Sequence, residues 1–248
     1  MKFLIIQTAF IGDVVIATAI VEKLKQFYPD STIDFLLRKG NESLLDHHPH
    51  LRQVLVFDKK KNKYRNLLGM IKIIRAEKYD YVINAQRFLT TGIMTILSGA
   101  KHTIGYDKNP LSSLFSEKIV HVISTTEGGQ NEAERKLALV EKLTDRSFVK
   151  PKLYPSSSDF EKVKREDEYI CVAPASVWFT KQFPTSKWIE LINQLPDRYV
   201  ICLIGSKEDI NLAMILSQKS KIECFDRQSR IQVLQLSNHR KSKIYLGN

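Results

Sequence analysis

The stretch Lys2-Phe-Leu-Ile-Ile-Gln7, followed directly by Thr8-Ala-Phe-Ile-Gly-Asp-Val-Val15, decides the fold that this sequence predicts. The apolar run is typical of a buried strand, and Val14–Phe27 has the spacing of an amphipathic helix. The turn between them holds Gly12 and places Asp13 at the start of the helix. A strand, a short turn and a helix are the opening of an α/β fold with a parallel sheet.

The same alternation of strand and helix continues along the chain. Further strands are expected at Thr32–Leu37, Gln53–Phe57, Tyr79–Ala85, Thr103–Gly105, Tyr169–Ala173 and Tyr199–Ile204. Helices are expected from the cationic run at 59–65 through Lys78, and at Thr90–Ser98, Asn131–Leu143, Ser186–Leu195 and Glu208–Gln218. This order predicts two Rossmann-like domains that face each other across a cleft.

Composition divides the chain into three parts. Residues 1–150 form the first domain, and 151–225 form a shorter, incomplete second domain, with a linker at Phe148–Asp159 that contains two prolines and three serines in a row. Residues 226–248 lose the strand and helix rhythm, so we interpret them as an atypical basic tail and hypothesise a reading frame broken near residue 225. A sheet that lacks strands exposes an unpaired edge, so we expect a poorly stable product.

The net charge of +11 over 248 residues points to a polyanionic partner. Nucleic acid, an anionic membrane surface and a phosphorylated or acidic substrate all fit, as does an ordinary solvated face. Residues 1–150 hold 23 Lys and Arg against 16 Asp and Glu, whereas 151–225 hold ten of each and 226–248 hold five cations and one acid. The basic run Lys59-Lys-Lys-Asn-Lys-Tyr-Arg65 holds a single aromatic residue, and the chain shows no recognised nucleic-acid module, which disfavours a nucleic-acid partner.

Several features favour a cytoplasmic chain. The amino terminus imitates a secretory signal, but Gln7 and Asp13 interrupt its apolar run. No apolar run approaches the roughly 20 residues that a membrane-spanning helix needs. The three cysteines are isolated and odd in number, which is typical of buried thiols in a reducing compartment. We therefore expect a cytoplasmic location, with the basic surface allowing peripheral contact with the inner face of the cytoplasmic membrane.

Two segments carry the chemistry. The first strand and helix are joined by a turn with one glycine instead of three spaced glycines, which disfavours a nicotinamide dinucleotide. Asp13 lies where such folds bind ligands. Its carboxylate acts either as a general base or as a cap of the helix. In the second half, Pro174-Ala-Ser-Val-Trp-Phe-Thr-Lys-Gln-Phe-Pro184 joins a strand to a helix, whose free N–H groups attract anions. Lys181 adds a positive charge there, and the alternative is an ordinary surface lysine.

Together these segments resemble glycosyltransferase family 9, the heptosyltransferases of the lipopolysaccharide inner core, over nearly all of residues 1–225. The resemblance implies two Rossmann-like domains of the GT-B type, the first for the acceptor and the second for the donor. It makes Asp13, after Gly12, the general base, and it makes Lys181 the cation at the donor phosphates. By the same resemblance Ser176 and Thr180 contact the donor phosphates, Glu208 contacts the donor nucleotide, and Arg135 of Asn131-Glu-Ala-Glu-Arg135 faces the acceptor.

The implied reaction is inverting transfer of heptose from an ADP-sugar to a hydroxyl of the lipopolysaccharide core. Asp13 would take the acceptor proton, and Lys181 would stabilise charge on the departing diphosphate. Neither a metal nor another cofactor is implied, and we place His47, His48 and His50 in a turn without partners. The cations Lys60, Lys61 and Lys63 of the basic run either bind the carboxylates and phosphates of the acceptor or form a solvated loop.

The chain departs from the family near its end. The family signature Asp-[ST]-x-x-x-His is missing, and His239 does not replace it. The chain is therefore interpreted as a C-terminally truncated member. The alternative function is an inactive remnant that binds only the acceptor.

Overall fold

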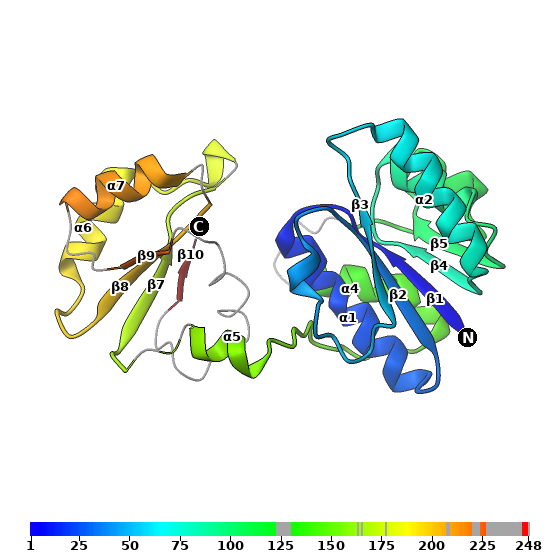
Figure 1. Cartoon of the computed structure of the whole chain (residues 1–248), viewed down its shortest axis with the longest axis horizontal. Helices are drawn as coiled ribbons and strands as arrows, with labels where there is room; N and C mark the ends of the chain where they lie inside the picture. The colour runs from blue at the N-terminus through cyan, green and yellow to red at the C-terminus, as the bar shows by residue number, and fades with distance from the viewer. Residues whose placement is uncertain are drawn as a thin grey trace. The chain divides into compact units, whose positions relative to one another are not determined.

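A computed structural model describes residues 1–122, 130–162, 164, 166–176, 178–206, 209–219, 224–226 and 245–247. The chain forms two compact units, Met1–Tyr154 and Pro155–Asn248. Each unit is built on its own parallel sheet (Figure 1). The assignment of one unit to the acceptor and the other to the donor stays a prediction.

The first unit contains a six-stranded, all-parallel sheet in the order β3-β2-β1-β4-β5-β6. Its strands are β1 (Lys2–Ile6), β2 (Thr32–Arg38), β3 (Gln53–Phe57), β4 (Tyr81–Asn84), β5 (His102–Tyr106) and β6 (Glu117–Ile119). The sequence patterns did not predict β6, a strand of only three residues. The order runs outward from β1 in both directions, so the direction of winding reverses between β1 and β4. Doubly wound sheets of this order bind ligands at that reversal point, beyond the carboxyl ends of the strands.

In the part of the first unit that the structure describes, α-helices cover the faces of this sheet (Figure 1). They are α1 (Ile11–Phe27), α2 (Lys63–Glu77), α3 (Leu89–Ile96) and α4 (Glu132–Leu137), and short 3-10 turns lie at η1 (Glu42–Leu44), η2 (Ser112–Leu114) and η3 (Ala138–Leu143). Helix α1 begins three residues earlier than predicted, so Asp13 lies inside its first turn. The predicted helix Asn131–Leu143 is α4 continued as the 3-10 turn η3.

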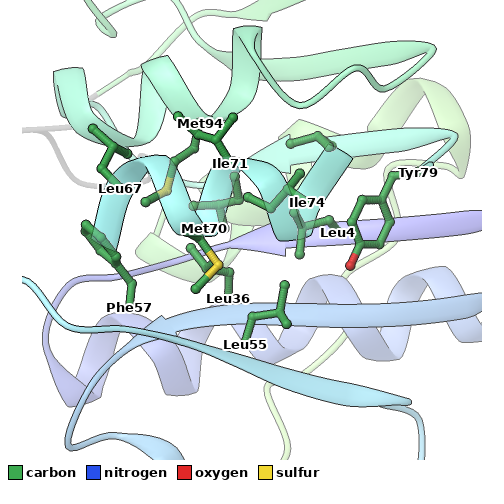
Figure 2. Close-up of a cluster of buried hydrophobic side chains, with 12 residues drawn as sticks. Leu4, Leu36, Leu55, Phe57, Leu67, Met70, Ile71, Ile74, Tyr79 and Met94 are labelled. Carbon is green, nitrogen blue, oxygen red and sulfur yellow. The ribbon is translucent and has the colours of Figure 1, made fainter. Parts of the chain in front are cut away.

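Alternating side chains of the strands divide the core between the two faces of the sheet. Leu4 and Ile6 of β1 pack with Leu67, Met70, Ile71 and Ile74 of α2, together with Met94 of α3 (Figure 2). Phe3 and Ile5 alternate with them and are equally buried, so they belong to the opposite face. The strands are therefore apolar on both sides, which is typical of a parallel sheet covered by helices.

The segment predicted as a linker packs partly onto the first unit. The N–H of Lys152 donates to Oγ1 of Thr18 on α1, at 2.9 Å. Leu153 is buried, and the Tyr154 hydroxyl donates to the Glu22 carboxylate at 2.9 Å. The end of this segment begins helix α5 (Ser157–Lys162). Proline and serine content predicted a loop correctly but did not predict that its first half is bound to α1.

The second unit contains a four-stranded parallel sheet in the order β10-β7-β8-β9. Its strands are β7 (Tyr169–Ala173), β8 (Val200–Ile204), β9 (Cys224–Asp226) and β10 (Tyr245–Gly247), and its helices include α6 (Thr185–Gln194) and α7 (Ile210–Lys219). Trp188 and Ile192 of α6 pack with Leu216 of α7 over β7 and β8. Strand β10 comes from the basic tail and pairs with β7. Within the described residues, no helix is both long and apolar enough to cross a membrane.

Candidate functional site

The loop that follows β1 lies at the reversal point of the first sheet and is tied to the loop after β4. The Thr8 hydroxyl donates to Oε1 of Gln86 at 2.7 Å, and Nε2 of Gln7 donates to the carbonyl oxygen of Ala85 at 3.2 Å. Gln7, Thr8 and Gln86 are all buried. Buried polar groups need hydrogen-bond partners, so these contacts hold the two loops in one arrangement.

The cationic run contributes to the same loop through its first residue. Nζ of Lys59 donates to the carbonyl oxygen of Thr8 at 2.7 Å. Nδ2 of Asn41 donates to the carbonyl oxygen of Ala9 at 3.2 Å. Burial lowers the pKa of the half-buried Lys59, and the nearby charges of Arg38 and Lys63 lower it further. Lys59 is therefore a structural anchor of the β1–α1 loop and differs from the exposed lysines that follow it.

Asp13 lies in the first turn of α1, at the edge of this anchored loop. The N-cap residue is Phe10, and it makes no side-chain capping bond, so Asp13 is not the cap that the sequence left open. In the part of the chain that the structure describes, the Asp13 carboxylate makes no hydrogen bond or ion pair. Gly12 is exposed and borders open space. The carboxylate thus lies near the helix N-terminus, where its negative charge is stabilised, and the neighbouring Gly12 leaves open space beside it.

A buried lysine lies beneath the site, and the sequence patterns did not predict its role. Lys136 of α4 is 4% exposed, and its Nζ donates to the carbonyl oxygen of Ala85 at 2.9 Å. Burial lowers the pKa of Lys136 to about 8. The negative charge of Asp13 opposes this lowering, whereas the positive charges of Arg135 and Arg87 lower the pKa further. Helical periodicity assigns lysines to the solvent, so only the fold identifies this buried charge close to Asp13.

Arg135 is largely occupied by contacts within the first unit. Its Nη2 forms an ion pair with Glu132, and its Nη1 donates to the carbonyl oxygen of Val122 at 3.0 Å. Its Nε is buried without a partner among the described residues.

The sequence motif that precedes Arg135 is explained by capping of helix α4. Oδ1 of Asn131 accepts from the N–H of Glu134 at 2.9 Å, and the Glu134 carboxylate accepts from the N–H of Asn131 at 2.8 Å.

A cationic cavity of about 510 Å³ adjoins the anchored loop, in the part of the chain predicted to bind the acceptor. It lies at the carboxyl ends of β2 and β3. Its lining includes five cations and one acid, namely Arg38, Lys39, Lys59, Lys60, Lys61 and Asp58. Oδ1 of Asp58 accepts hydrogen bonds from the backbone N–H groups of Lys60 and Lys61, at 2.9 Å and 3.2 Å. The side chains of both lysines take no part in these bonds, and both residues are exposed. Lys63 is exposed at the start of α2 and is not among the lining residues.

In the second unit, the loop between β7 and α6 carries the other predicted residues. Ser176 is half-buried, and its Oγ accepts from the N–H of Trp178 at 3.2 Å. Thr180 and Lys181 are exposed in the short 3-10 turn η4 (Phe179–Lys181). The turn is followed by the N-terminus of α6, which has no side-chain cap. An exposed ammonium group and uncapped N–H groups in one loop are suited to an anion such as a diphosphate.

The aromatic residues of this loop differ in exposure. Phe183 packs edge-on against the buried Trp188, with ring centroids 5.2 Å apart, as packing of the loop onto its own domain predicts. Trp178 is 64% exposed. Glu208, which was predicted to contact the donor nucleotide, lies outside the described residues.

The prediction that the three histidines lack partners is wrong for two of them. His48 is buried, with its Nε2 3.4 Å from Oε1 of Glu22, and its ring lies edge-on to Tyr154. Nε2 of His50 lies 3.9 Å from the other Glu22 oxygen. These partners are distant in sequence, so the local pattern could not indicate them. Among the described residues, no group of three or more His, Cys, Asp or Glu side chains is arranged to hold a metal ion.

Comparison with known proteins decides the family. The model of glycosyltransferase family 9 (heptosyltransferase) matches residues 67–236, which is more than half of the chain. The chain belongs to glycosyltransferase family 9. The match begins within α2, so Asp13 and Gly12 lie before it. Membership is thus shown independently of the predicted base.

Curated relatives of this family 9 member are lipopolysaccharide heptosyltransferases. Lipopolysaccharide heptosyltransferase 3 of Escherichia coli is 27% identical over 220 residues, covering 83% of this chain and 64% of the relative. Lipopolysaccharide heptosyltransferase 1 of Pseudomonas aeruginosa is 23% identical, covering 80% of this chain and 59% of the relative. The chain thus spans about three fifths of the length of these relatives.

Solved structures share the fold. A family 9 glycosyltransferase from Veillonella parvula matches 98% of this chain and 74% of its own with a TM-score of 0.81 at 16% identity. The E. coli heptosyltransferase WaaC, solved with ADP-2-deoxy-2-fluoro heptose, matches 100% of this chain and 82% of its own with a TM-score of 0.79 at 19% identity. At these identities the match establishes the α/β architecture of the heptosyltransferases.

Proposed function

We propose that this family 9 member is an inverting glycosyltransferase that moves heptose from ADP-heptose to the inner core of lipopolysaccharide. The observation that carries the proposal is Asp13, a carboxylate without a partner in the described part of the chain, at the reversal point of the first sheet. Relatives named lipopolysaccharide heptosyltransferases, and a heptosyltransferase solved with an ADP-heptose analogue, support the choice of donor and acceptor.

The proposed step is a single displacement at the anomeric carbon of the donor. The acceptor oxygen forms the new bond to that carbon as the bond to the diphosphate oxygen breaks, which inverts the configuration. Asp13 accepts the proton of the attacking hydroxyl, and ADP leaves with the electron pair. Lys181 and the N–H groups at the start of α6 stabilise the charge that develops on the diphosphate. Ser176 and Thr180 contact the donor phosphates, and Glu208 contacts the donor nucleotide.

The acceptor is proposed to bind on the first unit. Lys60 and Lys61 line the cationic cavity, and Lys63 adds a charge next to it. Gly12 leaves room beside Asp13 for the attacking hydroxyl. Arg135 is proposed to act on the acceptor through the positive potential it adds, because its guanidinium already bonds to Glu132 and Val122.

The test compares two variants in a transfer assay with ADP-heptose and a deacylated core acceptor. Asp13→Asn is expected to abolish transfer while leaving ADP affinity unchanged, and Asp30→Asn, an exposed acid next to α1, is the matched control. Lys181→Met is expected to weaken ADP binding by calorimetry, with Lys164→Met, an exposed lysine outside the β7–α6 loop, as its control. Full activity of Asp13→Asn would overturn the proposed base.

The alternative is an inactive remnant that binds only the acceptor. The region that matches the E. coli relative covers 64% of that relative. Calorimetry of the full chain separates the two functions, because an active enzyme binds both ADP-heptose and the acceptor. Acceptor binding without donor binding would establish the remnant.

A further inference from the structure

Helix α2 exposes apolar side chains on the side that faces away from the core. Its inward residues Leu67, Met70, Ile71 and Ile74 fill the core cluster (Figure 2). On the other side Tyr64 is 78% exposed, Leu68 62% and Ile73 46%. A helix that covers a sheet ordinarily carries polar residues on its outer side. The apolar residues on the outer side of α2 are therefore not explained by the fold of the first unit.

Cations are interleaved with these apolar side chains. Arg65 and Lys72 are exposed on the same helix, and no ion pair involves either of them within the described ranges. Residues 59–78 contain eight Lys or Arg and a single acid, Glu77. Glu77 is occupied by ion pairs with Lys2 and Arg52. The outer side of α2 thus combines apolar side chains with an uncompensated positive charge.

A groove of about 800 Å³ runs along this side of the helix. It lies between α2 and the end of β3, and its lining includes Val56, Tyr64, Leu68, Lys72 and Ile73. The groove shares Phe57 and Asp58 with the cationic cavity at the carboxyl ends of β2 and β3. The apolar surface is therefore continuous with the region proposed to bind an anionic acceptor.

We propose that the outer face of α2, formed by Tyr64, Arg65, Leu68, Lys72 and Ile73, docks on an anionic lipid bilayer. Surface-bound helices place aromatic and leucine side chains at the boundary between headgroups and acyl chains, while Lys and Arg bind the lipid phosphates. A small soluble anion would not bury the three apolar side chains. An anionic bilayer offers both requirements, because its phosphates complement the cations and its acyl chains accept the apolar side chains. The proposed surface does not depend on the transfer reaction.

The test measures partitioning of the full chain onto sedimenting vesicles. One set contains phosphatidylglycerol and phosphatidylethanolamine, and the other contains phosphatidylcholine alone. The chain is expected to bind the anionic set, and binding is expected to fall steeply as salt is raised. Leu68→Ser is expected to weaken partitioning about fivefold or more. Arg65→Gln with Lys72→Gln is expected to weaken it by at least about tenfold.

Matched controls separate docking from a general effect of the substitutions. Leu114 is also 62% exposed, so Leu114→Ser removes the same apolar group elsewhere on the first unit. Lys118→Gln with Lys150→Gln removes two other exposed cations. All variants are first compared by thermal unfolding. The control substitutions are expected to leave partitioning within about twofold of wild type.

Three results would overturn the proposal. The first is equal partitioning of the α2 variants and their controls. The second is equal binding to both vesicle sets. The third is a dimer, detected by ultracentrifugation, that Leu68→Ser dissociates without changing partitioning, because α2 would then join two copies of the chain.

Discussion

The ammonium group of Lys136 donates a hydrogen bond to the carbonyl oxygen of Ala85, at 2.9 Å. This bond joins α4 to the end of β4, at the point where the winding of the first sheet reverses. The same carbonyl oxygen accepts from Gln7, which precedes the β1–α1 loop. A buried positive charge thus supports the loop that leads to Asp13, and it acts on that carboxylate through its field.

Replacement of Lys136 is expected to alter the pH dependence of transfer. Burial lowers the pKa of Lys136 to about 8, so its ammonium group loses its charge as pH rises through this value. The kcat/KM of the wild type should therefore fall above about pH 8, whereas Lys136→Met should show no such basic limb and a kcat/KM that is lower on the order of tenfold below it. Lys136→Arg keeps its charge at these pH values, so it should remove the basic limb without that loss. An unchanged basic limb in an active, folded Lys136→Met enzyme would show that Lys136 has only a structural role.

Lys59 and Lys60 are neighbours with different expected roles. Lys59→Met removes the bond to the Thr8 carbonyl, so the free energy of unfolding should fall by about 1 to 2 kcal/mol, and kcat should fall with it. Lys60→Met should change stability by less than about 0.5 kcal/mol. Lys60→Met should raise the KM for the acceptor and leave the affinity for ADP unchanged, and Lys61→Met and Lys63→Met should have the same effect. Urea unfolding and acceptor kinetics measure the two effects, and equal stability losses at both positions would contradict this division.

Asp34 is expected to be a sensitive point of the first unit. It is fully buried on β2, where its carboxylate accepts from Nε of Arg52 at 2.9 Å, Nε2 of Gln53 at 3.0 Å and the Tyr79 hydroxyl at 2.5 Å. Asp34→Ala leaves the buried Tyr79 hydroxyl without its acceptor. The unfolding free energy should fall by about 3 to 5 kcal/mol in urea titrations. The exposed Asp30→Asn serves as control, and a similar small loss in both variants would be inconsistent with the buried network.

Stability is expected to fall in mild acid because of His48. Burial lowers the pKa of His48 from 6.5 to about 4, and the charges of His50 and Lys152 contribute. The unfolded chain takes up a proton near its ordinary pKa, whereas the folded chain resists it. Stability that is present above pH 6.5 is therefore lost as pH falls toward about 4.

The expected loss is about 2 kcal/mol between about pH 7.5 and about pH 5. Urea unfolding across this range measures it. His48→Gln should flatten the dependence, and the exposed His47→Gln should leave it unchanged. Identical slopes in wild type and His48→Gln would rule out His48 as the source.

Much of the fold could be predicted because the decisive patterns are local. Strand β3 and strand β7 have the predicted bounds, since a short apolar run between polar turns is visible in any window of the sequence. Strand β6 could not be predicted, because three residues show no periodicity and its pairing with β5 decides its conformation. The docking of Tyr154 on Glu22 was missed for the same reason, since it depends on contacts across the unit.

The sequence by itself determined the α/β alternation and the position of Asp13 after the first strand, because hydrophobic periodicity and turn residues act over a few neighbouring positions. Only the tertiary structure decided which cations are buried anchors and which remain exposed. The bonds from Lys59 to Thr8 and from Lys136 to Ala85 each join residues 51 positions apart. Burial of a charge depends on such distant partners, and no local pattern distinguishes Lys59 from Lys60 or Lys136 from an ordinary surface lysine.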